Sequence, residues 1–85
     1  MWTVEEIEAR IAELVAEISL GRLAPEEVRP EHTLLGELGL DSMDYATVML
    51  DCEEWLDGKV DEAKVDWRQV TTVHLLAELL HRSQP

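Results

Sequence analysis

The chain is poor in basic residues. Its 85 residues include 7 Lys and Arg against 19 Asp and Glu, which gives a formal net charge of -12. A field of that sign repels phosphate backbones and anionic lipid headgroups, so the charge argues against binding to nucleic acid or to a membrane. It favours partners with basic surfaces, whose association should be faster at low salt than at high salt.

Cysteine and long apolar runs are also scarce. Cys52 is the only cysteine, so no disulfide can form within the chain. Small secreted domains usually carry an even set of cysteines, and we therefore expect a reducing, cytoplasmic location. The longest apolar runs are three residues, as in Val48 to Leu50, and no basic segment precedes an apolar one near Met1. These absences argue against a transmembrane helix and a signal peptide.

Length and composition predict one small globular domain over residues 1–85. The chain is 46% hydrophobic, which is enough to drive collapse and separates it from disordered acidic tails. Surface scaling predicts about 5,000 Å² of accessible surface for a folded protein of this size. We expect a monomer with a modest core.

Residues 3–20 show the apolar periodicity of an amphipathic helix. Thr3 and Glu6 have the spacing of a capping box at its start, and Gly21 is suited to end it because glycine readily adopts the left-handed conformation. Residues 22–40 interrupt the periodicity with prolines and glycines. We interpret them as a long loop anchored by apolar side chains, those of Leu34, Leu35, Leu38 and Leu40.

A second helix is predicted after Asp41 and extends to about Leu56, with Gly58 ending it. At 100° per residue one side of this helix is apolar and is expected to be buried. That side comprises Tyr45, Val48, Met49, Cys52, Trp55 and Leu56, widened by Met43, Ala46 and Leu50. The opposite strip comprises Asp44, Thr47, Asp51 and Glu54.

The rest of the chain predicts a short helix between Asp61 and Gln69 and a last helix capped by Thr71. Trp67, like Trp55 before it, is expected at the core or its edge rather than in the wall of a ligand pocket. The last helix would bury Val73, Leu76, Ala77 and Leu80. Three longer helices and one short one around a single core predict an all-α, four-helix bundle.

Ser42 lies at the start of the second predicted helix, directly after the long loop. Free backbone N–H groups and the positive end of the helix dipole favour a negatively charged group there, so Ser42 is well placed to carry a phosphoryl ester. The simpler interpretation is that Asp41 or Ser42 caps the helix, which is the commonest use of these residue types at such a position. The spacing alone leaves both interpretations open.

The segment from Glu37 to Asp44 resembles the phosphopantetheine attachment motif of acyl carrier proteins. The resemblance extends over the chain, since the first helix, the long loop, Glu53-Glu54 and residues 70–73 follow in the family's order. It implies that Ser42 receives 4′-phosphopantetheine from coenzyme A through a phosphopantetheinyl transferase, and that Asp41 helps to position the transferase's metal ion. The thiol of the arm would hold acyl or aminoacyl groups as thioesters. The protein would then be a carrier and not an enzyme.

The resemblance also makes the second helix and the loop before it a docking face for acyltransferases, ligases or synthases with basic patches. The implied docking residues are Leu40, Met43, Asp44, Thr47, Asp51 and Glu54. Reversing Asp44 or Glu54 to Lys is then expected to slow loading at low salt without loss of helicity. A solvated acidic helix face would have the same composition.

Several residues depart from the pattern of common fatty-acid carriers. Thr47 occupies a position where many of those carriers have an acid, and Tyr45 and Trp67 also differ. These departures argue against fatty-acid synthesis and favour a polyketide or aminoacyl pathway. The competing hypothesis is an acidic helical module that binds partners through the same face without a prosthetic group.

Three further patterns do not support a site. The segment around Ser42 lacks the glycines of a nucleophile elbow, which argues against catalysis by serine. His74, Glu78 and His81 share one helix face but lack the His-Glu-x-x-His order of zinc sites. Lys59 stands where a calcium loop needs an oxygen ligand. We therefore assign no catalytic residue and no metal ligand.

Overall fold

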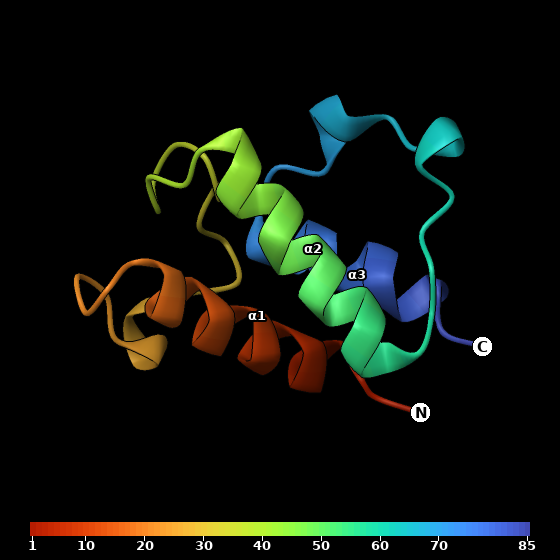
Figure 1. Cartoon of the computed structure of the whole chain (residues 1–85), viewed down its shortest axis with the longest axis horizontal. Helices are drawn as coiled ribbons and strands as arrows, with labels where there is room; N and C mark the ends of the chain where they lie inside the picture. The colour runs from red at the N-terminus through yellow and green to blue at the C-terminus, as the bar shows by residue number, and fades with distance from the viewer.

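The computed structural model describes all 85 residues and consists of three α-helices joined by loops (Figure 1). The helices are α1 (Val4–Ile18), α2 (Ser42–Leu56) and α3 (Val73–Arg82). Three single 3₁₀ turns lie in the connections: η1 (Pro25–Glu27), η2 (Glu62–Lys64) and η3 (Trp67–Gln69). The prediction of an all-α protein is confirmed.

The four-helix count is not confirmed, because η2 and η3 replace the predicted short helix between Asp61 and Gln69. Val65 separates the two turns in an extended conformation. The Asp66 carboxylate then accepts a hydrogen bond from the backbone N–H of Arg68 at 3.2 Å. Such local bonds from aspartate compete with helix continuation, and so short a segment gains little from helix propagation alone.

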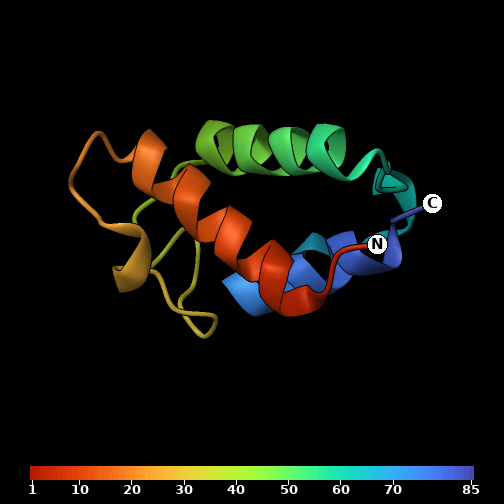
Figure 2. The same ribbon diagram turned by 90° about the horizontal axis from the view of Figure 1, so that it is seen from below.

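The core lies around α1, which packs against both of the other helices. Figure 2 shows α1 crossing between α2 and α3, which make little direct contact with each other. All 19 buried residues are hydrophobic, and the accessible surface of 5278 Å² is close to the value predicted from size. No helix is long and apolar enough to span a lipid bilayer.

The start of α1 is as predicted, whereas its end differs slightly. The Thr3 side chain accepts a hydrogen bond from the N–H of Glu6, and the Glu6 carboxylate accepts one from the N–H of Thr3, at 3.2 and 2.9 Å. The helix ends at Ile18, before the predicted residue 20. Leu20 and Gly21 both adopt positive φ, so the chain reverses over two residues and not at the glycine alone.

The ends of α2 and α3 show two further differences. Asp57, and not Gly58, takes the left-handed conformation that ends α2. Gly58 has a different reason to be glycine, since a Cβ at this position would collide with the backbone carbonyl of Ser83. The residue that caps α3 is Thr72 and not the predicted Thr71.

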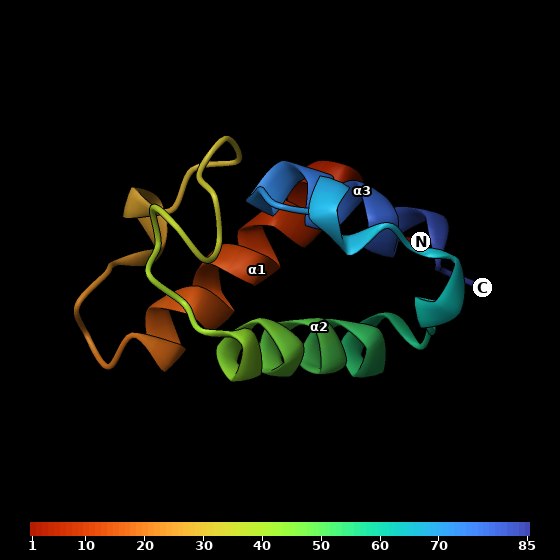
Figure 3. The ribbon, with the colours of Figure 1, turned by 90° about the horizontal axis from the view of Figure 1, so that it is seen from above.

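The long loop before α2 is anchored to the start of α3. The N–H of Leu34 donates to the carbonyl of Thr71 at 2.9 Å. Leu34, Leu38 and Leu40 are buried as expected, while Leu35 is 53% exposed. Figure 3 shows the later segment, residues 57–72, running back from the end of α2 alongside α3. The two connections therefore meet at the start of α3.

Candidate functional site

Asp41 caps the start of α2. Its carboxylate accepts a hydrogen bond from the N–H of Asp44 at 2.8 Å, and the N–H of Asp41 donates to the Asp44 carboxylate at 3.3 Å. This pair is a capping box in which aspartate takes the place of the usual glutamate or glutamine. The capping role that the sequence left open between Asp41 and Ser42 thus belongs to Asp41.

Ser42 is the first residue of α2, and its hydroxyl is free. The chain has three serines. The hydroxyl of Ser19 donates to the carbonyl of Ala16 at 2.8 Å, and the hydroxyl of Ser83 donates to the carbonyl of Leu79 at 2.9 Å. Ser42 is exposed, and its hydroxyl makes no hydrogen bond within the protein. Of the three serines it is therefore the one available for modification.

The surroundings of Ser42 suit a phosphate ester. The N–H groups of Ser42 and Met43 belong to the first turn of α2, where they have no carbonyl partner within the helix. They and the helix dipole favour an anion on the Ser42 oxygen. The negative charges of the Asp41 and Asp44 carboxylates repel such an anion unless a cation lies between the carboxylates and the anion. The structure contains no group of three or more His, Cys, Asp or Glu side chains that could hold a metal ion.

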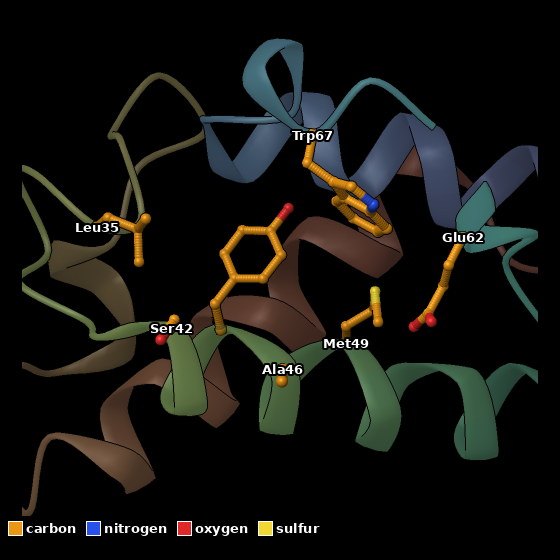
Figure 4. Close-up of a pocket in the computed structure, with 7 residues that line it drawn as sticks. Leu35, Ser42, Ala46, Met49, Glu62 and Trp67 are labelled. Atoms are coloured by element: carbon orange, nitrogen blue, oxygen red, sulfur yellow. The ribbon is translucent and has the colours of Figure 1, made fainter. Parts of the chain in front are cut away.

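A hollow of about 330 Å³ opens beside Ser42 (Figure 4). Its size is at the small end of ligand-binding pockets. Five of its seven lining residues are hydrophobic; the seven are Leu35, Ser42, Tyr45, Ala46, Met49, Glu62 and Trp67. The sequence placed Trp67 at the core edge and not in a pocket, but the structure has it partly buried and also lining this hollow.

Tyr45 is held in place at the wall of the hollow. Its hydroxyl donates to the carbonyl of Val70 at 3.0 Å, which links α2 to the segment before α3. Its ring meets the ring of Trp67 edge to face, with centroids 6.1 Å apart. Burial raises the pKa of Tyr45 to about 12, so the hydroxyl stays protonated and able to donate.

The outer face of α2 carries most of the residues that the resemblance implies for docking. Met43 is 78% exposed, and Thr47, Asp51 and Glu54 are also exposed. Leu40 is the exception, because its side chain is only 4% exposed and belongs to the core. The expectation that Leu40 contacts partners is therefore corrected, since a buried side chain holds the loop and is not available to a partner.

Asp44 and Leu50 also differ from expectation. Asp44 is half-buried and forms part of the capping box, so its reversal to Lys would remove the acceptor of the Asp41 N–H as well as a charge. Leu50 was expected to widen the buried side but is 58% exposed, next to Asp51. The sequence itself indicates this exposure. The side chains of Val48, Met49 and Leu50 span about 200° around the helix axis, so all three cannot face one core.

The remaining candidate residues lie away from this site. His74 Nδ1 is 2.7 Å from a Glu8 carboxylate oxygen on α1, and Nε2 is 3.5 Å from Glu78 on α3. The hydrogen bond with Glu8 raises the pKa of His74 above its ordinary value. His74 thus forms a link between two helices and does not converge with His81 on a metal position. Cys52 is buried, and burial raises its pKa to about 12.

Comparison with known proteins assigns the chain to a protein family. A family model described as the phosphopantetheine attachment site matches residues 9–80, which include the whole of α2, the loop before it and the hollow. A search of curated proteins returned no match. The chain belongs to the phosphopantetheine attachment site family and is a carrier, not an enzyme, on which 4′-phosphopantetheine is held covalently.

Proposed function

We propose that Ser42 carries the phosphopantetheine arm and that the protein presents short acyl or aminoacyl groups, held on that arm as thioesters, to successive enzymes. The observation that carries the proposal is the free, exposed hydroxyl of Ser42 at the start of α2. Tethering keeps the cargo at a high effective concentration at each active site that the carrier visits.

Loading is a phosphoryl transfer that a separate transferase catalyses. The Ser42 oxygen forms a bond to the phosphorus that bears the pantetheine unit, and the pyrophosphate bond of coenzyme A breaks. Adenosine 3′,5′-bisphosphate leaves, and the hydroxyl proton passes to a base of the transferase. Asp41 fixes the first turn of α2 through its hydrogen bond to Asp44. Its outer carboxylate oxygen would help to hold the metal ion that neutralises the phosphates.

The cargo class that we propose is a polyketide or aminoacyl intermediate. The hollow beside Ser42 is small and is bordered by the rings of Tyr45 and Trp67 and by the carboxylate of Glu62. Such a lining suits a short or polar group better than a long alkyl chain, because burying an unpaired carboxylate against alkyl surface is unfavourable. Thr47, which occupies a position where many fatty-acid carriers have an acid, supports the same cargo class.

The docking surface that we propose is the exposed face of α2, with Met43 and Leu50 as its apolar contacts and Asp51 and Glu54 as its charges. Partners would be the phosphopantetheinyl transferase and an acyltransferase, ligase or synthase with a basic patch. Exposed apolar side chains framed by charge are typical of sites that bind transiently.

Intact-mass measurement tests the attachment site. The protein is incubated with coenzyme A, magnesium and a broad-specificity phosphopantetheinyl transferase, and we expect a gain of one phosphopantetheine. Ser42→Ala should gain nothing, whereas Ser19→Ala and Ser83→Ala should be loaded like the wild type. An unchanged wild-type mass would contradict the proposal and favour the acidic interaction module without a prosthetic group.

A further inference from the structure

A second hollow lies next to the one at Ser42. It has a volume of about 300 Å³ and is lined by Thr33, Leu35, Gly36, Tyr45, Val70 and Thr71. Ser42 does not border it, but Leu35 and Tyr45 border both hollows. These two side chains therefore form the wall between the hollow that Ser42 borders and the hollow that it does not border.

Tyr45 is the fixed part of this wall. Its hydroxyl bond to the Val70 carbonyl and its edge-to-face contact with Trp67 hold the ring from two sides. Leu35 has neither restraint and is more than half exposed. A change that removes the Tyr45 ring, or lets it turn, would join the second hollow to the first.

We infer that Tyr45 sets the length of the cargo that can rest against the protein. With the hydroxyl bonded to Val70, only a short acyl group fits in the hollow beside Ser42. With the ring removed, a longer chain continues into the second hollow. This inference rests on the proposed attachment of the arm to Ser42, and it assigns to Tyr45 a role in specificity and none in the chemistry.

The expected size of the effect follows from apolar burial. Each methylene that moves from water into an apolar space shifts the equilibrium toward the resting position by about fourfold. In the wild type this gain should stop once the first hollow is full, because the ring of Tyr45 blocks further carbons. In Tyr45→Ala it should continue for several more carbons.

Hydroxylamine cleavage of the thioester measures the resting position without any partner enzyme. Wild-type and Tyr45→Ala proteins are loaded with saturated acyl groups of increasing length, and the cleavage rate of each is recorded. We expect protection in the wild type to reach a plateau at short chains, and protection in Tyr45→Ala to keep rising, by about fourfold per added carbon that is accommodated. The same length profile in both proteins would overturn the inference.

Two further variants complete the test. Tyr45→Phe keeps the ring but loses the bond to Val70, so it should move the plateau to longer chains even if Tyr45→Ala does not fold; a wild-type profile in Tyr45→Phe would overturn the inference. Leu75→Ala removes an exposed apolar side chain of α3 that borders neither hollow and lies outside the proposed docking surface, and it should match the wild type. Failure of the wild type to gain phosphopantetheine would instead contradict the proposed function, so the two failures are distinguishable.

Discussion

Asp41 and Asp44 each accept a hydrogen bond from the other's backbone N–H, and Ser42 lies between them with its hydroxyl unengaged. The two carboxylates accept the hydrogen bonds of these N–H groups at the start of α2, so the Ser42 hydroxyl is not needed as a cap. A serine that also capped α2 would have its oxygen engaged with a backbone N–H and would have to release that bond before the oxygen could react. Division of the two roles between neighbouring residues avoids this conflict.

The capping role and the proposed metal role of Asp41 can be separated by substitution. Asp41→Ala should lower the free energy of unfolding by about 1 kcal/mol, because the N–H of Asp44 loses its acceptor. Asp41→Asn should keep most of the stability, since asparagine caps as well as aspartate, yet it should slow loading by the transferase because it has no charge for the metal ion. Urea denaturation and the initial rate of mass gain measure the two effects. Equal loading rates for Asp41→Asn and the wild type would contradict the metal role.

Charge on the outer face of α2 should govern the rate of loading. Glu54→Lys should slow loading several-fold at low salt, and the difference should shrink as salt is added, because steering by surface charge is screened. Glu31→Lys is the matched control: it is exposed, lies in the loop away from α2, and changes the net charge equally, from -12 to -10. If both variants slow loading to the same extent, net charge and not the α2 face is responsible.

Thiol reactivity should distinguish the arm from Cys52. Burial raises the pKa of the Cys52 thiol to about 12, so almost none of it is thiolate near neutral pH, and the core shields it from reagents. The loaded native protein should therefore show one fast-reacting thiol with a reagent such as iodoacetamide, and Ser42→Ala should show none. Denaturant should expose Cys52 in both. Rapid labelling of Cys52 in the native, unloaded protein would contradict its burial.

The contact between His74 and Glu8 should make stability depend on pH. The folded-state pKa of His74 lies above the ordinary value of 6.5, mainly because of the hydrogen bond with Glu8, with charge contributions from Glu78, Glu8 and Glu5. Its stabilising contribution should be fully present below pH 6.5 and should be lost as the pH rises through the higher folded-state value.

Denaturation curves of the wild type and His74→Gln measure this dependence. The difference between their urea midpoints should shrink as the pH rises through and above 6.5. Glu8→Gln should show the same loss of pH dependence, because it removes the partner. A difference that stays constant across this range would show that the charged form of His74 contributes nothing.

The sequence alone was enough for features that depend on neighbours a few residues apart. The capping box of Thr3 and Glu6, the start of α2 after Asp41 and the apolar faces of the helices all follow from local hydrogen bonds and helical periodicity. The family motif around Ser42 is likewise contiguous. For this reason the all-α class and the carrier role could both be predicted from the order of the residues.

Packing decided the rest, because it depends on residues far apart in the chain. Leu40 and Met43 are both apolar neighbours of the serine, yet one is buried and the other exposed, according to where the loop meets the core. The hollow exists only because the segment with Trp67 returns beside α2, and no local pattern encodes that approach. Local bonding thus determined where the helices begin and which serine hydroxyl is free, whereas the tertiary structure decided which side chains surround Ser42.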